Sequence, residues 1–198
     1  MELFLLRHPA FAESTHGRCI GQIDLASIPV PDAERREILE CCAEREIIFS
    51  SDLQRTATLA ARLAHDSACV HCSDARLREV SFGNWEGLMW EEIEARSAEA
   101  CKLWMEDFVK LAPPGGESLL ALSERVLAWK NAALRDFLDK RVLAVSHSGV
   151  IRVLLCDALG IPLQNAFRLQ IDYLTMSSIL YGRSDSPQVR SMNQQINA

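Results

Sequence analysis

The sequence lacks the marks of several protein classes. Its 198 residues contain no apolar run long enough to cross a bilayer, no internal repeat and no low-complexity tract. The first residues lack the charged and long apolar segments of a signal peptide, and the seven cysteines show no disulfide-framework spacing. A formal net charge of −6 argues against nucleic-acid binding, although local arginines could still bind an anionic small molecule. We therefore expect a single cytoplasmic domain over residues 1–198, without a membrane or nucleic-acid partner.

Three short apolar runs dominate the pattern. Residues 3–6, 47–49 and 142–145 each suit a strand buried on both faces, as in a parallel sheet covered by helices, which predicts an α/β fold. Helices are predicted at 32–45 with Asp32 as N-cap, and at 53–64, 89–111, 118–138 and 148–159, with further strands at 69–72 and 174–181. Residues 183–198 are predicted to be a loose polar tail or an edge strand.

The cysteines of the predicted strand 69–72 do not indicate a metal site. Cys69, His71 and Cys72 have the spacing of a metal-binding knuckle, but zinc needs four ligands and no second paired motif exists. A buried strand carrying small thiols is the simpler interpretation.

Charged and polar side chains follow each of the three apolar runs. Arg7 and His8 follow the first, Ser50, Ser51 and Arg55 the second, and Ser146, His147 and Ser148 the third. If the strands are parallel neighbours, these residues meet in one crevice at the carboxyl edge of the sheet. Two of the junctions also begin helices, whose N-termini favour anions. Two arginines and two histidines beside them predict a pocket for a phosphate group.

Such a pocket suggests a covalent phosphoryl transfer. A neutral histidine can attack phosphorus and hold the phosphoryl group, while the other cationic groups stabilise its oxygens. A carboxylic acid must protonate the leaving alcohol and later accept a proton from water. Glu79 is the best candidate, because the irregular segment 77–87 can place it over the crevice. Glu13 and Glu117 are weaker choices.

Five motifs in order resemble those of the histidine phosphatase superfamily. They are Leu5-Leu6-Arg7-His8, Ser50-Ser51-Asp52-Leu53-Gln54-Arg55, Leu77 to Gly87, Pro114-Gly115-Gly116-Glu117-Ser118 and Ser146-His147-Ser148-Gly149-Val150-Ile151-Arg152. The resemblance implies a three-layer α/β/α sandwich with a mostly parallel central sheet, the phosphoglycerate-mutase-like fold, and a phosphatase without cofactor or metal. It implies that His8 is phosphorylated, that Arg7, Arg55 and His147 bind the phosphoryl group and that Glu79 is the proton donor. Ser148 and Gln22 are further predicted phosphate contacts, and Gln22 could instead cap a turn.

The chain departs from the usual pattern directly after His8. Most members continue Arg-His with Gly-Glu/Gln-Thr, whereas Pro9, Ala10 and Phe11 stand here. Proline occurs in members similar to the α-ribazole 5′-phosphate phosphatase of the cobalamin pathway, and the segment 17–25 resembles that branch. The chain also lacks the longer insertion of true mutases. We therefore expect a phosphatase of a small phosphorylated metabolite, with α-ribazole 5′-phosphate as one candidate and a homodimer as one compatible assembly.

Three other functions account for parts of the pattern. Ser148 could be the nucleophile of an α/β-hydrolase, but that fold places its histidine after the serine, and no histidine follows His147. A non-catalytic phospho-ligand-binding relative is favoured only by the altered Pro9-Ala10-Phe11 loop. A phosphoglycerate-mutase-type enzyme would transfer the phosphoryl group between hydroxyls faster than it releases phosphate.

Overall fold

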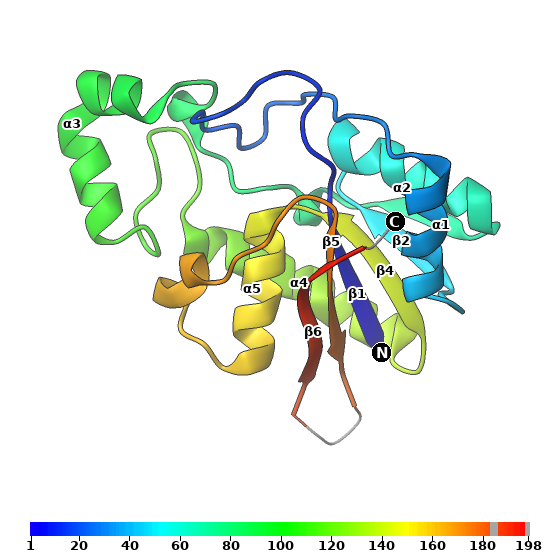
Figure 1. The fold of residues 1–198 in the computed structure, drawn as a ribbon. Coiled ribbons are helices and arrows are strands. Elements are labelled where there is room, and N and C mark those ends of the chain that lie inside the picture. Colours follow the sequence, from blue (N-terminus) through cyan, green and yellow to red (C-terminus); the bar gives the residue numbers. More distant parts are fainter. Residues whose placement is uncertain (183–185, 197–198) are drawn as a thin grey trace.

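A six-stranded sheet forms the centre of the molecule (Figure 1). The computed structural model describes residues 1–182 and 186–196. The strand order is β3-β2-β4-β1-β5-β6, in which β3, β2, β4 and β1 are parallel and β5 and β6 are antiparallel additions. The strands are β1 (Glu2–Arg7), β2 (Ile47–Ser50), β3 (Val70–Ser73), β4 (Arg141–Ser146), β5 (Thr175–Leu180) and β6 (Gln188–Gln195).

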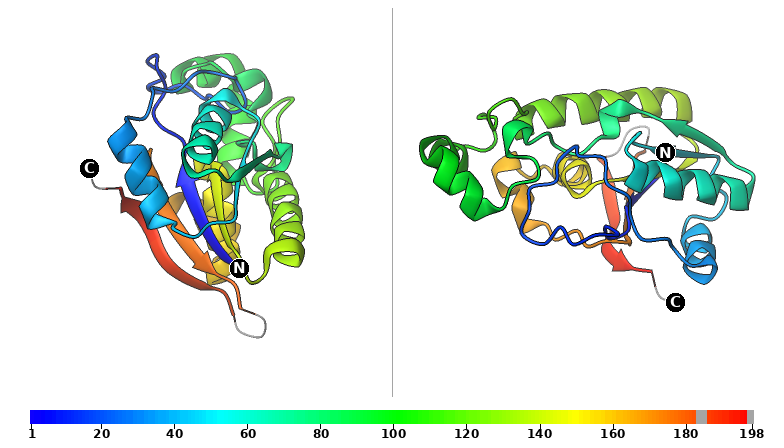
Figure 2. Two further views of the ribbon diagram at one scale, coloured as in Figure 1. Left: turned by 90° about the vertical axis from the view of Figure 1, so that its right-hand side faces the viewer. Right: turned by 90° about the horizontal axis from the view of Figure 1, so that it is seen from above.

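Alternation along β1 explains the three layers. Leu3 and Leu5 belong to the core beneath α4 (Leu119–Phe137) and α5 (Ser148–Leu159), whereas Phe4 and Leu6 belong to the core beneath α1 (Asp32–Cys41) and α2 (Gln54–Ser67). Because successive side chains of a strand point to opposite faces, an uninterrupted apolar run can serve two cores at once. Figure 2 shows the helices on both faces of the sheet.

The remaining helix lies beyond the sheet. α3 (Trp90–Glu106) stands at the rim on the side of the strands' carboxyl ends (Figure 1), and its backbone leaves helical geometry at Ser97. It packs through Ile93 and Cys101 against Trp85 and Cys19, a small core separate from the two on the faces of the sheet. This rim core joins the long N-terminal loop to the segment around Trp85, so both are fixed above the sheet edge where β1 and β4 end.

The predicted fold class is confirmed, with local corrections. The three apolar runs are parallel neighbours, β4 lying between β1 and β2. Asp32 is the first residue of α1 rather than its cap, because Pro31 occupies the N-cap position. β3 is not buried: it is an edge strand, and Val70 is 62% exposed.

The structure tests part of the prediction of a loose tail or an edge strand over residues 183–198. Residues 188–195 are an edge strand, β6, rather than a loose segment. Residues 183–185 and 197–198, which the same prediction covered, lie outside the described residues. Within residues 1–182 and 186–196, no helix combines the length and apolarity that a bilayer crossing requires.

Candidate active site

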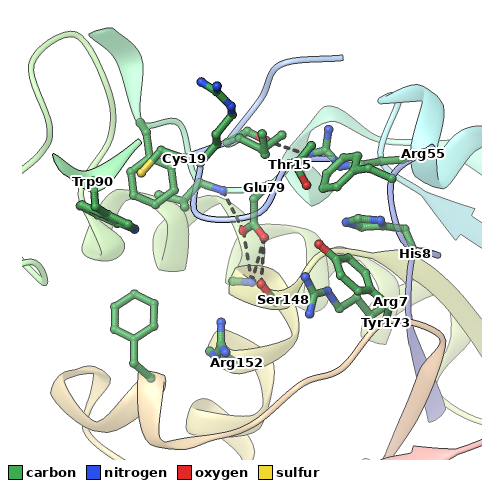
Figure 3. A pocket seen from close by; sticks show the side chains of 18 residues that line it. Arg7, His8, Thr15, Cys19, Arg55, Glu79, Trp90, Ser148, Arg152 and Tyr173 are labelled. Atoms are coloured by element: carbon green, nitrogen blue, oxygen red, sulfur yellow. Dashed lines mark hydrogen bonds between the residues drawn. The ribbon is translucent and has the colours of Figure 1, made fainter. Parts of the chain in front are cut away.

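A cavity of about 250 Å³ opens where β1 and β4 end. Figure 3 shows Glu79 in its middle, with Ser148 below and His8 to the right. Its lining combines four guanidinium groups with five aromatic rings and few other polar groups. The main lining residues are Arg7, Arg18, Arg55, Arg152, Phe11, Phe82, Trp90, Phe167, Tyr173, His8, Thr15, Glu79 and Ser148.

His8 is arranged as a nucleophile. Its Nδ1 lies 2.7 Å from the carbonyl oxygen of Pro9, and because a carbonyl only accepts, Nδ1 must carry the proton. Nε2 therefore keeps its lone pair. The ring is 3% exposed. Burial, with Arg55 and Arg7 nearby, lowers the pKa of His8 to about 3, so the imidazole is neutral at pH 7.

His147 lies beside His8 at the buried end of the cavity. The two ring centroids are 5.2 Å apart, and His147 is fully buried at the start of α5. Its Nδ1 accepts a hydrogen bond from Arg55 Nε at 3.2 Å, and its Nε2 lies 2.8 Å from Ser51 Oγ. Burial, followed by the charge of Arg55, holds the pKa of His147 well below its usual value, so this ring is also neutral in the free protein.

Both arginines predicted to bind phosphate are held by backbone carbonyls. Arg7 donates from Nη1 to the carbonyl of Ile171 at 2.6 Å, and Tyr173 covers its guanidinium, 3.7 Å from the ring centroid. Arg55 donates to the carbonyls of Ile23 and Gly21 at 2.7 and 2.6 Å. Within the described part of the chain neither arginine forms an ion pair with a carboxylate, so both positive charges are available to an anion.

Glu79 reaches the cavity from the segment before α3. Its carboxylate accepts hydrogen bonds from Gly149 N at 3.1 and 3.2 Å, from Val80 N at 2.9 Å and from Ser148 Oγ at 3.2 Å. Gly149 makes this approach possible, because a Cβ there would lie 2.2 Å from Glu79 Oε1. The α5 N-terminus therefore holds the carboxylate inside the cavity. The alternative acid Glu117 instead forms an ion pair with Arg125.

The structure assembles most of the predicted site and places one residue differently. Arg7, His8, Arg55, Glu79 and Ser148 line the cavity, and His147 is hydrogen-bonded to Arg55. Gln22 does not line it. Its side-chain amide donates to the backbone carbonyl of Glu79 at 3.0 Å, so Gln22 supports the Glu79 segment rather than the cavity wall.

Several cavity residues were not identified from the sequence. Arg152, one turn after Ser148 on α5, lies in the last of the five motifs, but the resemblance implies no role for it. Its Nε donates to the carbonyl of Leu169 at 2.9 Å and its guanidinium lies over Phe167. Phe167 and Tyr173 come from the connection between α5 and β5, whose residues carry no pattern that indicates a cavity. Trp90, the first residue of α3, also lines the cavity.

Comparisons with known proteins agree with this geometry. The family model of the histidine phosphatase superfamily (branch 1) matches residues 3–195. The chain is 30% identical to a glucosyl-3-phosphoglycerate phosphatase of Mycolicibacterium vanbaalenii, over 82% of this chain and 76% of the relative. It is 28% identical to phosphoserine phosphatase 1 of Hydrogenobacter thermophilus, over 90% and 86%. The crystal structure of the α-ribazole phosphatase from Shigella flexneri superposes with a TM-score of 0.84 at 25% identity, over 100% of this chain and 99% of that one.

Proposed function

Because this chain belongs to the histidine phosphatase superfamily and is a phosphoric monoester hydrolase, we propose that it hydrolyses a small phosphorylated metabolite through a phosphohistidine on His8. The observation that carries the proposal is the state of His8. Its ring is neutral, its Nδ1–H is held by Pro9, and its free Nε2 lies in a cavity lined by Arg7 and Arg55.

The residues then have distinct roles in two displacements. His8 Nε2 forms a bond to phosphorus while the bond from phosphorus to the ester oxygen breaks. Arg7, Arg55 and His147 stabilise the negative charge on the phosphoryl oxygens. Glu79 gives a proton to the departing alcohol, and its carboxylate then takes a proton from the water that attacks phosphohistidine. Phosphate leaves, and neutral His8 is restored.

The outer cavity narrows the class of substrate. Aromatic rings form much of its wall, and Arg152 lies on the same helix face as Ser148, one turn farther along. A leaving group with a flat or apolar face and a further negative group fits this lining. α-Ribazole 5′-phosphate is one candidate, favoured by the segment 17–25 and by the likeness to an α-ribazole phosphatase. We also place the enzyme in the cytoplasm, since all seven cysteines are free.

Hydrolysis of p-nitrophenyl phosphate tests the proposed function. We expect the wild-type protein to release phosphate in the presence of a chelator, because its cationic side chains do not depend on a metal. His8→Ala should abolish turnover, whereas His65→Ala, at a side chain that is 80% exposed, should not change it. Activity near the wild-type level in His8→Ala, or none in the wild type, would overturn the proposal.

A panel of phosphomonoesters then identifies the substrate class. It includes α-ribazole 5′-phosphate, phosphoserine, sugar phosphates and phosphoglycerates. Transfer between hydroxyls that outpaces phosphate release would indicate a mutase instead.

A further inference from the structure

A buried hydrogen-bond chain fixes the proton on His147. Arg55 Nε donates to His147 Nδ1 at 3.2 Å, and an arginine can only donate. Nδ1 therefore carries a lone pair, and the neutral ring must have its proton on Nε2. That proton is donated to Ser51 Oγ at 2.8 Å. Ser51 is fully buried, and among the described residues Nε2 forms no hydrogen bond to any other group.

The hydrogen bonds of Thr56 fix the direction in which Ser51 donates its proton. Ser51 Oγ lies 2.7 Å from Thr56 Oγ1, which itself lies 2.9 Å from the carbonyl of Leu53 and 3.1 Å from that of Ser51. Nε2–H of His147 and the backbone N–H of Leu53, at 3.3 Å, both donate to Ser51 Oγ. The Ser51 proton therefore goes to Thr56 Oγ1, and the Thr56 proton goes to a carbonyl. Ser51 consequently has no proton left to give to His147, and its oxygen accepts the Nε2 proton.

We propose that Ser51, backed by Thr56, is a positioning residue that locks His147 in the Nε2–H form and so obliges the ring to take up a proton when an oxyanion enters the cavity. Arg55 lines the cavity and its Nε lies 3.2 Å from Nδ1, so an oxyanion held by Arg55 comes close to that nitrogen. A lone pair at Nδ1 repels an anionic oxygen, and the ring cannot present Nδ1–H in its neutral form while Ser51 requires Nε2–H. Binding of a dianion therefore proceeds with one proton from solvent, which forms the imidazolium with N–H groups at both nitrogens. Arg55 Nε, released from Nδ1, then donates to the anion as well.

The charged groups around His147 favour a neutral ring when the cavity is empty and a protonated ring when a dianion is bound. The groups that face it are Arg55 from α2, His8 and Arg7 at the end of β1, and Arg125 from α4. These charges, together with burial, hold the pKa of His147 well below its ordinary value when the cavity is empty. A bound dianion reverses the sign of the local potential and favours the imidazolium.

Sulfate is the probe, because it remains a dianion across the neutral pH range and any proton taken up belongs to the protein. The inference rests on the proposed function only in that an oxyanion occupies the cavity. All proteins carry His8→Asn, so His8 cannot supply the proton and no turnover is needed. Failure of phosphatase activity and failure of proton uptake are therefore separate results.

Two measurements report the proton directly. With ¹⁵N-labelled histidine, the His147 ring should change from neutral Nε2–H to imidazolium at saturating sulfate and pH 8. The dissociation constant of sulfate should rise about tenfold per pH unit above neutrality, as expected for one linked proton.

Substitutions along this hydrogen-bond chain separate a positioning role of Ser51 and Thr56 from a general structural one. Ser51→Ala removes the acceptor of the Nε2 proton, so the neutral Nδ1–H form becomes available and the pH dependence should disappear. Thr56→Val leaves Ser51 in place but frees its hydroxyl proton for Nε2, and should flatten the dependence too. Ser50→Ala is the matched control, since Ser50 Oγ bonds to His71 and to the Ser51 carbonyl rather than to His147.

In Ser50→Ala the dissociation constant of sulfate should still rise about tenfold per pH unit. A His147 ring that stays neutral with sulfate bound in the otherwise unaltered chain would overturn the inference. An unchanged tenfold dependence in a folded Ser51→Ala or Thr56→Val protein would overturn it as well. Thermal unfolding of each variant establishes which of them is folded.

Discussion

Gly149→Ala is expected to disable the proton donor while leaving the nucleophile intact. Gly149 is the second residue of α5, and its backbone N–H bonds both carboxylate oxygens of Glu79. A Cβ at this position would lie 2.2 Å from Glu79 Oε1 and 3.3 Å from Leu122 Cδ2. The carboxylate is the flexible end of a side chain, so it moves away, whereas the Leu122 contact is only slightly tight.

The size of the effect follows from the role of Glu79. General acid catalysis contributes roughly 10²–10⁴-fold to a rate. We expect a loss of about 100-fold in kcat/KM for an alkyl phosphate, which corresponds to about 2.7 kcal/mol in the barrier. The loss for p-nitrophenyl phosphate should be much smaller, because its leaving group departs without a proton. Stability should hold, since alanine in a helix is favoured over glycine by roughly 0.5–1 kcal/mol.

The assay compares kcat/KM for glycerol phosphate and p-nitrophenyl phosphate in the wild type, Gly149→Ala and Glu79→Gln. The two variants should share the same selective loss. Leu159→Ala, at the exposed end of α5, is a control for disturbance of the helix and should change neither value. Equal slowing of both substrates by Gly149→Ala would refute the assignment of Glu79 as the acid.

Three further predictions concern other parts of the structure. The pKa of His8 falls from 6.5 to about 3 on folding, so the unfolded chain binds more protons and stability is lost as pH falls below 6.5. Between pH 7 and 5 the wild type should therefore lose about 2 kcal/mol more unfolding free energy than His8→Asn in urea titrations, and equal losses would contradict the buried, neutral state of His8. Arg152→Gln should lower the preference for 3-phosphoglycerate over glycerol 3-phosphate, measured as the ratio of kcat/KM, by about 10-fold or more, as expected for a lost charge-assisted hydrogen bond. Arg168→Gln, at an exposed residue, should keep this ratio. An unchanged ratio in Arg152→Gln would show that Arg152 does not bind the leaving group. Trp129 is 1% exposed and packs edge-on against Phe49, so Trp129→Ala should cost about 3–5 kcal/mol of unfolding free energy, and a cost below about 1 kcal/mol would show that this core tolerates the cavity.

The sequence revealed the inner site because its residues follow buried strands. Leu3 to Leu6 and Val142 to Val145 are apolar without interruption, so parallel neighbours were expected, and parallel neighbours bring Arg7, His8 and His147 to one edge. That inference needs only local patterns and one topological rule. Glu79 was found by a different route, through the chemistry that a phosphatase requires and a motif match.

The outer site could not be predicted in the same way. Tyr173 reaches Arg7 because Asn193 on β6 bonds both the backbone and the carboxylate of Asp172, which fixes the loop. This contact joins residues more than 160 positions apart through a strand that the polar sequence did not clearly indicate. Ser51 presents a similar case: the sequence places it only among the polar residues after a buried strand, and its distance to His147 reveals its partner.

The phosphoenzyme itself is the most direct test of a phosphohistidine mechanism. Protein mixed with p-nitrophenyl phosphate is quenched in alkali, digested and analysed by mass spectrometry. We predict a phosphoryl group on the peptide that carries His8, at higher occupancy in Glu79→Gln because loss of the base slows its hydrolysis, and none in His8→Ala. A phosphoryl group on a different residue, or phosphate release by a protein that never carries one on His8, would contradict the mechanism.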